Sequence, residues 1–180
     1  MKKKLFNEIE IPEGIEVEID GTKIKIKGKE GELERNFNVT NILIEKKDGK
    51  IIIGNVKSTK KEKRLMNTIT KHIKNMLKGV QEKFEYKLKI CFNHFPITVE
   101  IKGNEAVIKN FLGEKIPRKI KILQDAEVEI QKDIITIKSN DKEIAGQTAA
   151  NFEKATRVPM KDRRIFQDGI FITSKAGREI

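Results

Sequence analysis

The sequence has few of the residues and segments on which several protein classes depend. It holds one Cys in 180 residues, so it forms no internal disulfide and does not fit a secreted disulfide scaffold. With two His, it has too few soft ligands for a tetrahedral Cys/His zinc site. No apolar run approaches about 18 residues, and the N-terminal MKKKLFNEIEIPEG lacks the apolar stretch of a secretory signal. These absences predict an intracellular soluble protein.

Aromatic residues are also scarce, with no Trp and one Tyr. The chain has no Gly-Phe-Gly-Phe pattern of the kind with which a sheet stacks unpaired bases. Base stacking is therefore not the expected mode of nucleic-acid binding. We instead expect six phenylalanines in the core, namely Phe92, Phe95, Phe111, Phe152, Phe166 and Phe171.

Motifs that carry catalysis are missing as well. The chain has neither Gly-x-x-x-x-Gly-Lys-Ser/Thr nor Gly-x-Gly-x-x-Gly, so no phosphate-binding loop of a nucleotide enzyme is expected. Cys91 and His94 lie three residues apart at an apparent strand end, which directs them to opposite faces. We interpret them as a buried Cys and a structural His rather than a catalytic pair. The prediction is therefore no enzyme, no cofactor and no metal.

Positive charge is what the sequence has in excess. Lys plus Arg number 38 against 27 Asp plus Glu, which gives a net charge of +11 at pH 7. This imbalance predicts an anionic partner, and from charge alone that partner is a nucleic acid, a membrane headgroup or an acidic protein. The hydrophobic content of 37% is sufficient for a folded core.

The chain also repeats itself. Val17–Gly21 (VEIDG) aligns with Val99–Gly103 (VEIKG), and the same offset brings Ile26-Lys27 onto Ile108-Lys109. Apolar residues alternate with charged ones through these stretches, as in half-buried strands. We predict an α+β fold of two tandem similar domains from an internal duplication, each a mainly antiparallel sheet packed with one helix. The predicted boundaries are residues 1–82 and 83–180.

Each copy ends in a segment with helical periodicity, near residues 59–79 and 142–156. The first helical segment starts with Thr59-Lys60-Lys61-Glu62, a capping-box pattern. We expect Gly79 to serve as the C-cap of that helix. The segment Gly79–Tyr86 is the expected joint between the two domains.

The basic residues gather in three clusters. The lysine-rich helix near 59–79 is typical of a solvated face, and whether it faces RNA or solvent stays open. The other two clusters contain Arg, which suits bidentate phosphate contact better than Lys does. They comprise Lys115, Arg118, Lys119 and Lys121, and then Arg157, Lys161, Arg163 and Arg164, with Lys175 and Arg178 in the tail. We expect them to contact phosphate, with recognition of the backbone and shape of folded RNA or duplex.

Longer motifs resemble a known family. KDRRIFQDGIFI at Lys161–Ile172, closed by Lys175, resembles the C-terminal signature of the universal large-subunit ribosomal protein L-six family. The stretches IPEGIEVEIDGTKIKIKGKEGELER, HFPITVEI, NFLGEKIPRK and GQTAANFEKAT are similar to its archaeal and eukaryotic branch, whose eukaryotic members are called L-nine. The resemblance runs from about Ile9 to Lys175. Phe171 departs from it, since the family usually has Tyr there.

The resemblance implies a structural protein of the large ribosomal subunit, cytoplasmic and without catalysis. It implies binding of large-subunit ribosomal RNA near the sarcin-ricin loop and the base of the factor-binding stalk, mainly through the C-terminal domain. The loop Gly113–Lys119 and the segment Arg157–Lys175 would carry the contact, with the Asp168-Gly169 turn orienting the basic segment. Other implied partners are neighbouring large-subunit and stalk-base proteins and nearby translation factors, with no membrane and no DNA. The expected RNA-binding residues are Lys115, Arg118, Lys119, Arg157, Lys161, Arg163, Arg164 and Lys175.

Two other classes of function stay open at this point. A free DNA- or RNA-binding regulator would bind isolated nucleic acid but stay off ribosomes. A protein-interaction module would use apolar edge strands and show little salt dependence. An enzyme is the third and weakest alternative, and loss of activity in Cys91→Ser would reveal it.

Overall fold

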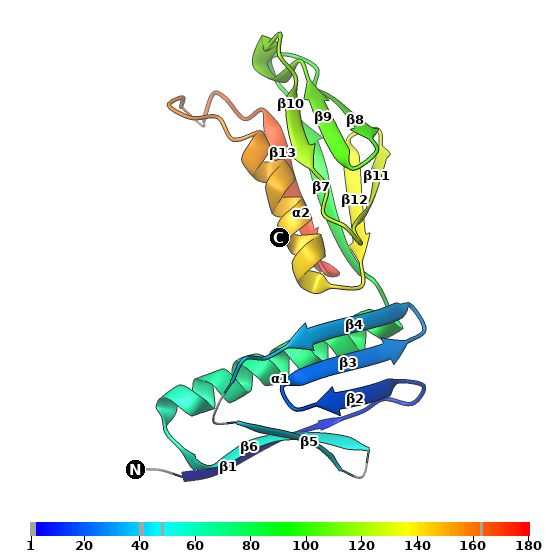
Figure 1. Cartoon of the computed structure of the whole chain (residues 1–180). Coiled ribbons are helices and arrows are strands. Elements are labelled where there is room, and N and C mark those ends of the chain that lie inside the picture. The colour runs from blue at the N-terminus through cyan, green and yellow to red at the C-terminus, as the bar shows by residue number, and fades with distance from the viewer. Residues whose placement is uncertain (1–2, 40–41, 48, 163) are drawn as a thin grey trace. The chain divides into compact units, whose positions relative to one another are not determined.

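The chain forms two compact units in a computed structural model that describes residues 3–39, 42–47, 49–162 and 164–180 (Figure 1). The units are Met1–Lys83 and Phe84–Ile180, so the division falls one residue after the boundary predicted from the sequence. Each unit has its own hydrophobic core, one around Ile26 and Ile73 and the other around Leu88 and Phe152.

The N-terminal unit combines two three-stranded antiparallel sheets with one long helix. The sheet orders are β1-β6-β5 and β2-β3-β4. A tight turn through Gly21 joins β2 to β3, and Glu16 and Glu18 lie opposite Lys27 and Lys25 across this hairpin, an arrangement of opposite charges that favours pairing. The elements are β1 (Lys3–Glu10), β2 (Glu16–Asp20), β3 (Lys23–Gly28), β4 (Gly31–Asn36), β5 (Leu43–Lys47), β6 (Lys50–Ser58) and α1 (Lys60–Gln81).

The C-terminal unit has a three-stranded sheet, a five-stranded sheet and a second helix. The sheet orders are β10-β9-β8 and β11-β12-β7-β13-β14. In Figure 1 helix α2 runs alongside β7 and β13. The elements are β7 (Phe84–Cys91), β8 (Thr98–Lys102), β9 (Glu105–Lys109), η1 (Phe111–Gly113), β10 (Arg118–Lys121), β11 (Glu127–Gln131), β12 (Ile134–Ser139), α2 (Lys142–Ala155), β13 (Gly169–Lys175) and β14 (Arg178–Glu179).

The two units share one topology, which confirms the predicted duplication and the α+β class. The order β1-β6-β5 corresponds to β7-β12-β11, and β2-β3-β4 corresponds to β8-β9-β10. The last two strands, β13 and β14, have no counterpart among the described residues of the N-terminal unit. They add to the free edge of β7, so the connection from α2 to β13 is a feature of the C-terminal unit alone.

The start of α1 follows the sequence prediction, and its end does not. Thr59 and Glu62 form the predicted capping box. The prediction that Gly79 caps the C-terminus is wrong, because the helix continues to Gln81. The backbone amide of Glu30 donates to the Val80 carbonyl at 2.9 Å, so the turn after β3 satisfies a carbonyl that would otherwise need a glycine cap.

The phenylalanines divide between core and surface. Phe111 and Phe152 are fully buried, as predicted. Phe92, Phe95 and Phe171 are 46%, 48% and 42% exposed, so the prediction that they lie in the core is wrong. Phe92 and Phe95 follow the end of β7 in the loop to β8, and Phe171 occupies an outward position of β13. An exposed aromatic ring needs a functional explanation when others lie near it.

Candidate nucleic-acid interface

The loop between α2 and β13 contains most of the arginine-rich segment. Hydrogen bonds at Thr156 hold the two ends of this loop together. Thr156 ends α2, and its hydroxyl donates to the Phe152 carbonyl at 3.3 Å. The same hydroxyl oxygen accepts the backbone amide of Ile170 at 2.9 Å. Thr156 is buried, so these hydrogen bonds are protected from water. The loop therefore begins and ends at the same place in the core.

Asp168 anchors the far end of this loop. Its carboxylate is buried, and one oxygen accepts the backbone amides of Asn93 at 2.8 Å and His94 at 3.0 Å. The other oxygen accepts a hydrogen bond from the His94 Nδ1 at 2.7 Å. Burial by itself raises the pKa of Asp168, but the hydrogen bonds from His94 and Asn93 outweigh it and hold this pKa at about 2. The carboxylate therefore stays charged and fastens the loop to the segment that follows β7.

A stack of side chains extends this anchor toward the surface. The Phe166 ring stacks on the His94 ring, with centroids 4.8 Å apart and planes 14° from parallel. The Lys161 ammonium lies 4.3 Å from the centre of the Phe166 ring, within the range of a cation–π contact. Lys161 is thereby held at a defined place on an otherwise exposed loop. The structural interpretation of His94 fits this geometry, since the ring contacts Asp168 and Phe166.

Arg118 joins the second basic cluster to the end of α2. Its Nε donates to Glu114 Oε2 at 2.7 Å, and its Nη2 donates to the other carboxylate oxygen. Its Nη1 donates to the carbonyl of Ala155 at 2.6 Å, and the guanidinium lies 4.3 Å from the centre of the Phe111 ring. This pairing lowers the pKa of Glu114 through the hydrogen bond from Arg118. Arg118 thus brings the loop before β10 against the end of α2.

The other predicted residues of these clusters point to solvent. Lys115 and Lys119 are exposed, and the Lys119 ammonium is 4.0 Å from a Glu105 oxygen. Arg157 is exposed directly after α2. The Arg164 side chain is 89% exposed and pairs with Asp162 at 3.0 Å, an exposed contact that contributes little stability.

One predicted residue lies away from this surface, and another lies outside the described part of the chain. Arg163 lies outside the described residues. Lys175 ends β13 opposite Tyr86, whereas the loop enters β13 at Gly169 opposite Cys91. Because a strand rises roughly 3.3 Å per residue, Lys175 lies nearly the full length of β13 away from the loop. The surface formed by Lys115, Lys119, Arg157, Lys161 and Arg164 is called the basic face below.

The sequence predicted that the Asp168-Gly169 turn orients the basic segment, but it did not indicate the contact through which Asp168 does so. Asp168 contacts His94 across 74 residues, and no local pattern connects the two. The available signal is that Asp168 is the lone acidic residue in the segment 163–178. An isolated carboxylate in a basic segment favours a structural contact. Lys154, in the last turn of α2, is a further basic residue at this place that sequence reasoning did not select.

The described part of the chain offers little for other kinds of site. Within those residues, no group of three or more His, Cys, Asp or Glu side chains is placed to hold a metal ion. In the same residues, no helix is long and apolar enough to cross a lipid bilayer. Cys91 is half-buried rather than buried as predicted, and His94 is engaged with Asp168.

Arg118→Ala is expected to lower the free energy of unfolding of the C-terminal unit by about 1–2 kcal/mol, because it removes three hydrogen bonds from a charged donor. Arg118→Lys should recover little of this, since Lys cannot reproduce the planar fork. Thermal and denaturant unfolding would measure the change. Lys119→Ala, on the same strand, is the matched control and should stay within about 0.5 kcal/mol. Equal stability of Arg118→Ala and Lys119→Ala would show that the guanidinium has no structural role.

Comparison with known proteins agrees with this arrangement. The family model described as "Ribosomal protein L6" matches residues 11–83 and 95–169, one segment in each unit. "Large ribosomal subunit protein uL6" of Methanothrix thermoacetophila is 43% identical over 175 residues, covering 97% of this chain and 99% of the relative. The protein of the same name from Staphylothermus marinus is 47% identical over 172 residues, covering 93% of each chain.

A third relative of that name, from Sulfurisphaera tokodaii, is 44% identical over 172 residues, covering 95% of this chain and 92% of its own. All three relatives are archaeal-type proteins of the large subunit, as the resemblance implied. The family match spans both duplicated units, and the identity extends over nearly the whole chain. On these grounds the chain belongs to the ribosomal protein L6 family.

Proposed function

We propose that this chain binds large-subunit ribosomal RNA through the basic face of its C-terminal unit, near the sarcin-ricin loop and the base of the factor-binding stalk. Its role is structural: members of the family are proteins of the large ribosomal subunit and not enzymes. The position near the sarcin-ricin loop and the stalk base rests on the family resemblance. Neighbouring large-subunit and stalk-base proteins, and translation factors close by, belong to the same proposal.

The observation that carries the proposal is the attachment of a basic loop to a rigid scaffold. The Lys161 ammonium contacts the Phe166 ring, which stacks on the His94 ring. His94 is in turn hydrogen-bonded to the buried Asp168 carboxylate. A loop held in this way loses less conformational entropy on binding than a free loop would. Phosphate contacts give affinity without sequence preference, so the fixed shape of the face has to supply the selectivity.

We propose two different roles for the predicted residues. Lys115, Lys119, Arg157, Lys161 and Arg164 are exposed and are assigned to phosphate contact, together with Arg163 and Lys175 from the sequence prediction. Arg118 donates three hydrogen bonds within the chain and is assigned to shaping the face. We therefore propose a smaller set of primary contacts than the sequence alone suggested, centred on the loop after α2.

Sedimentation tests this function directly. Tagged protein in a cell lysate should be recovered in the large-subunit peak of a sucrose gradient, and a share should survive moderate salt because many phosphate contacts act together. Hydroxyl-radical footprinting of the recovered subunits should then show protection next to the sarcin-ricin loop. Recovery only at the top of the gradient would contradict the proposal and favour a free nucleic-acid-binding protein.

A further inference from the structure

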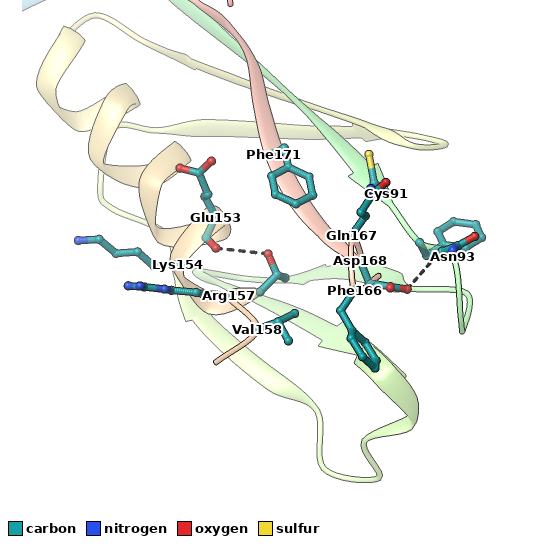
Figure 2. Close-up of a pocket in the computed structure, with 12 residues that line it drawn as sticks. Cys91, Asn93, Glu153, Lys154, Arg157, Val158, Phe166, Gln167, Asp168 and Phe171 are labelled. Atoms are coloured by element: carbon teal, nitrogen blue, oxygen red, sulfur yellow. Dashed lines mark hydrogen bonds between the residues drawn. The ribbon is translucent and has the colours of Figure 1, made fainter. Parts of the chain in front are cut away.

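An open pocket of about 820 Å³ lies beside the loop that follows α2 (Figure 2). Its wall combines aromatic, apolar and charged side chains from β7, the end of α2, the loop and β13. The residues that matter here are Phe92, Glu153, Lys154, Arg157, Gln167 and Phe171. From the sequence, Phe92 and Phe171 were expected in the core, so no pocket was predicted at this place.

Phe171 provides the exposed aromatic face of this pocket. It is 42% exposed, and in Figure 2 it projects into the space between the end of α2 and Cys91 of β7. Its ring lies close to Gly169: a Cβ on that glycine would be 3.1 Å from the Phe171 Cζ, so a side chain there would push the ring by a few tenths of an ångström. The ring therefore packs beside Gly169 and also lines the pocket.

The other aromatic residues of the pocket have different surroundings. Phe92 is 46% exposed and also lines the pocket. Phe166 already stacks on His94 and contacts the Lys161 ammonium, so its ring is engaged within the chain. Stacking on a new planar group therefore falls to Phe171, with Phe92 as the second apolar wall.

The charges at the rim indicate what the planar group is. Lys154 and Arg157 are exposed and extend outward from the end of α2, and Lys161 and Arg164 follow in the loop. Glu153 and Gln167 also line the pocket and are exposed, so they offer an acceptor and an amide to a polar edge. An apolar side chain of a protein partner would use the rings but none of these cations. A nucleotide can contact both the rings and the cations, because it joins a planar base to an anionic phosphate.

We propose that this pocket receives the base of one unpaired RNA nucleotide, which stacks on Phe171 while Lys154 and Arg157 contact the adjacent phosphates. The inference rests on the proposed function, since it names a specific contact within the RNA-binding surface. It adds selectivity that phosphate contacts lack, because unpaired bases offer their faces and edges to protein side chains.

Binding to deproteinised large-subunit RNA, measured by filter retention of the full chain, tests the pocket. Phe171→Leu should weaken binding about 5- to 150-fold, the range that loss of one stacked base produces. Phe171→Tyr keeps the aromatic face and should bind as the parent does. Phe95→Leu is the matched control, because Phe95 is equally exposed in the same unit but does not line the pocket.

Chemical probing of the bound RNA gives a second readout that a change in stability does not produce. The parent chain should protect one unpaired base from dimethyl sulfate or a carbodiimide reagent, and Phe171→Leu should restore its reactivity at protein concentrations that saturate the RNA. An unchanged affinity or an unchanged protection pattern in Phe171→Leu would overturn the proposal. So would an equal loss of affinity toward a fully paired RNA duplex, since a duplex presents no free base.

The outcomes also separate this proposal from the proposed function. Salt-dependent RNA binding that is indifferent to Phe171→Leu would leave the basic face as an RNA contact and remove the base pocket. The pocket would then be assigned to an apolar side chain of a protein neighbour. Absence of salt-dependent RNA binding in the parent chain itself would overturn both proposals together.

Discussion

Replacing Arg157, Lys161 and Arg164 together by Ala is expected to weaken binding to deproteinised large-subunit RNA about 10²-fold or more at about 0.1 M salt. Each lost phosphate contact removes a released counterion, so the plot of log K against log salt should become shallower by about 2–3 units. The three residues are exposed on one loop, so the fold should survive the change. Filter binding across a series of salt concentrations measures both effects.

A control with the same change in charge distinguishes a local contact from the general effect of net charge. Lys60→Ala, Lys63→Ala and Lys71→Ala, combined on the exposed side of α1, also remove three positive charges. If α1 faces solvent, this triple variant should reduce affinity only slightly and leave the salt slope near that of the parent. An equal loss in both triple variants would show that α1 is a primary RNA contact, and would answer the question that the sequence left open.

Asp168→Ala is expected to lower the free energy of unfolding of the C-terminal unit by about 3 kcal/mol. The substitution leaves two partly buried backbone donors, on Asn93 and His94, and the His94 ring without their acceptor. Hydrogen exchange at the Asn93 and His94 amides should accelerate accordingly, and the loop between α2 and β13 should become sensitive to proteases. RNA binding should weaken as well, because an unfastened loop has to be ordered on binding.

Asp162→Ala is the control for this change. Asp162 lies in the same loop, but its carboxylate is exposed and pairs with Arg164. Removing it should alter stability by no more than about 0.5 kcal/mol. Equal stability of the two variants would contradict the assignment of Asp168 as the anchor. Asp168→Asn keeps one carbonyl acceptor and should fall between the parent and Asp168→Ala.

The anchor also predicts a dependence of stability on pH. The pKa of Asp168 is about 2 in the folded chain and lies near 3.8 when the group is unperturbed. A lowered pKa means that the ionised carboxylate stabilises the fold above pH 4 or so, and that this contribution is lost as pH falls toward 2. The stability difference between the parent and Asp168→Ala should therefore shrink as pH falls from about 4 toward 2. A difference that stays constant or grows between about pH 4 and 2 would contradict the ionised anchor.

Local features of the fold could be predicted because the residues that cause them are close in the chain. The hairpin at Asp20-Gly21 follows from strand alternation on both sides of a turn dipeptide, and the capping box follows from Thr59 and Glu62. The repeat is detectable because both copies keep the same turn, at Gly21 and at Gly103. The prediction at Gly79 failed because α1 continues to Gln81, where the backbone amide of Glu30, far away in sequence, donates to the Val80 carbonyl.

The same distinction applies to the candidate site. The sequence by itself determined the α+β class, the duplication, the family and the two arginine-containing clusters, because composition, periodicity and motifs are local properties. Only the tertiary structure decided which of these residues act together. Three features depend on which strands pair and in what register. They are the contact of Asp168 with His94, the hydrogen bond from Arg118 to the Ala155 carbonyl and the exposure of Phe171. That pairing is set by the packing of the whole unit, so no segment of the chain read alone contains it.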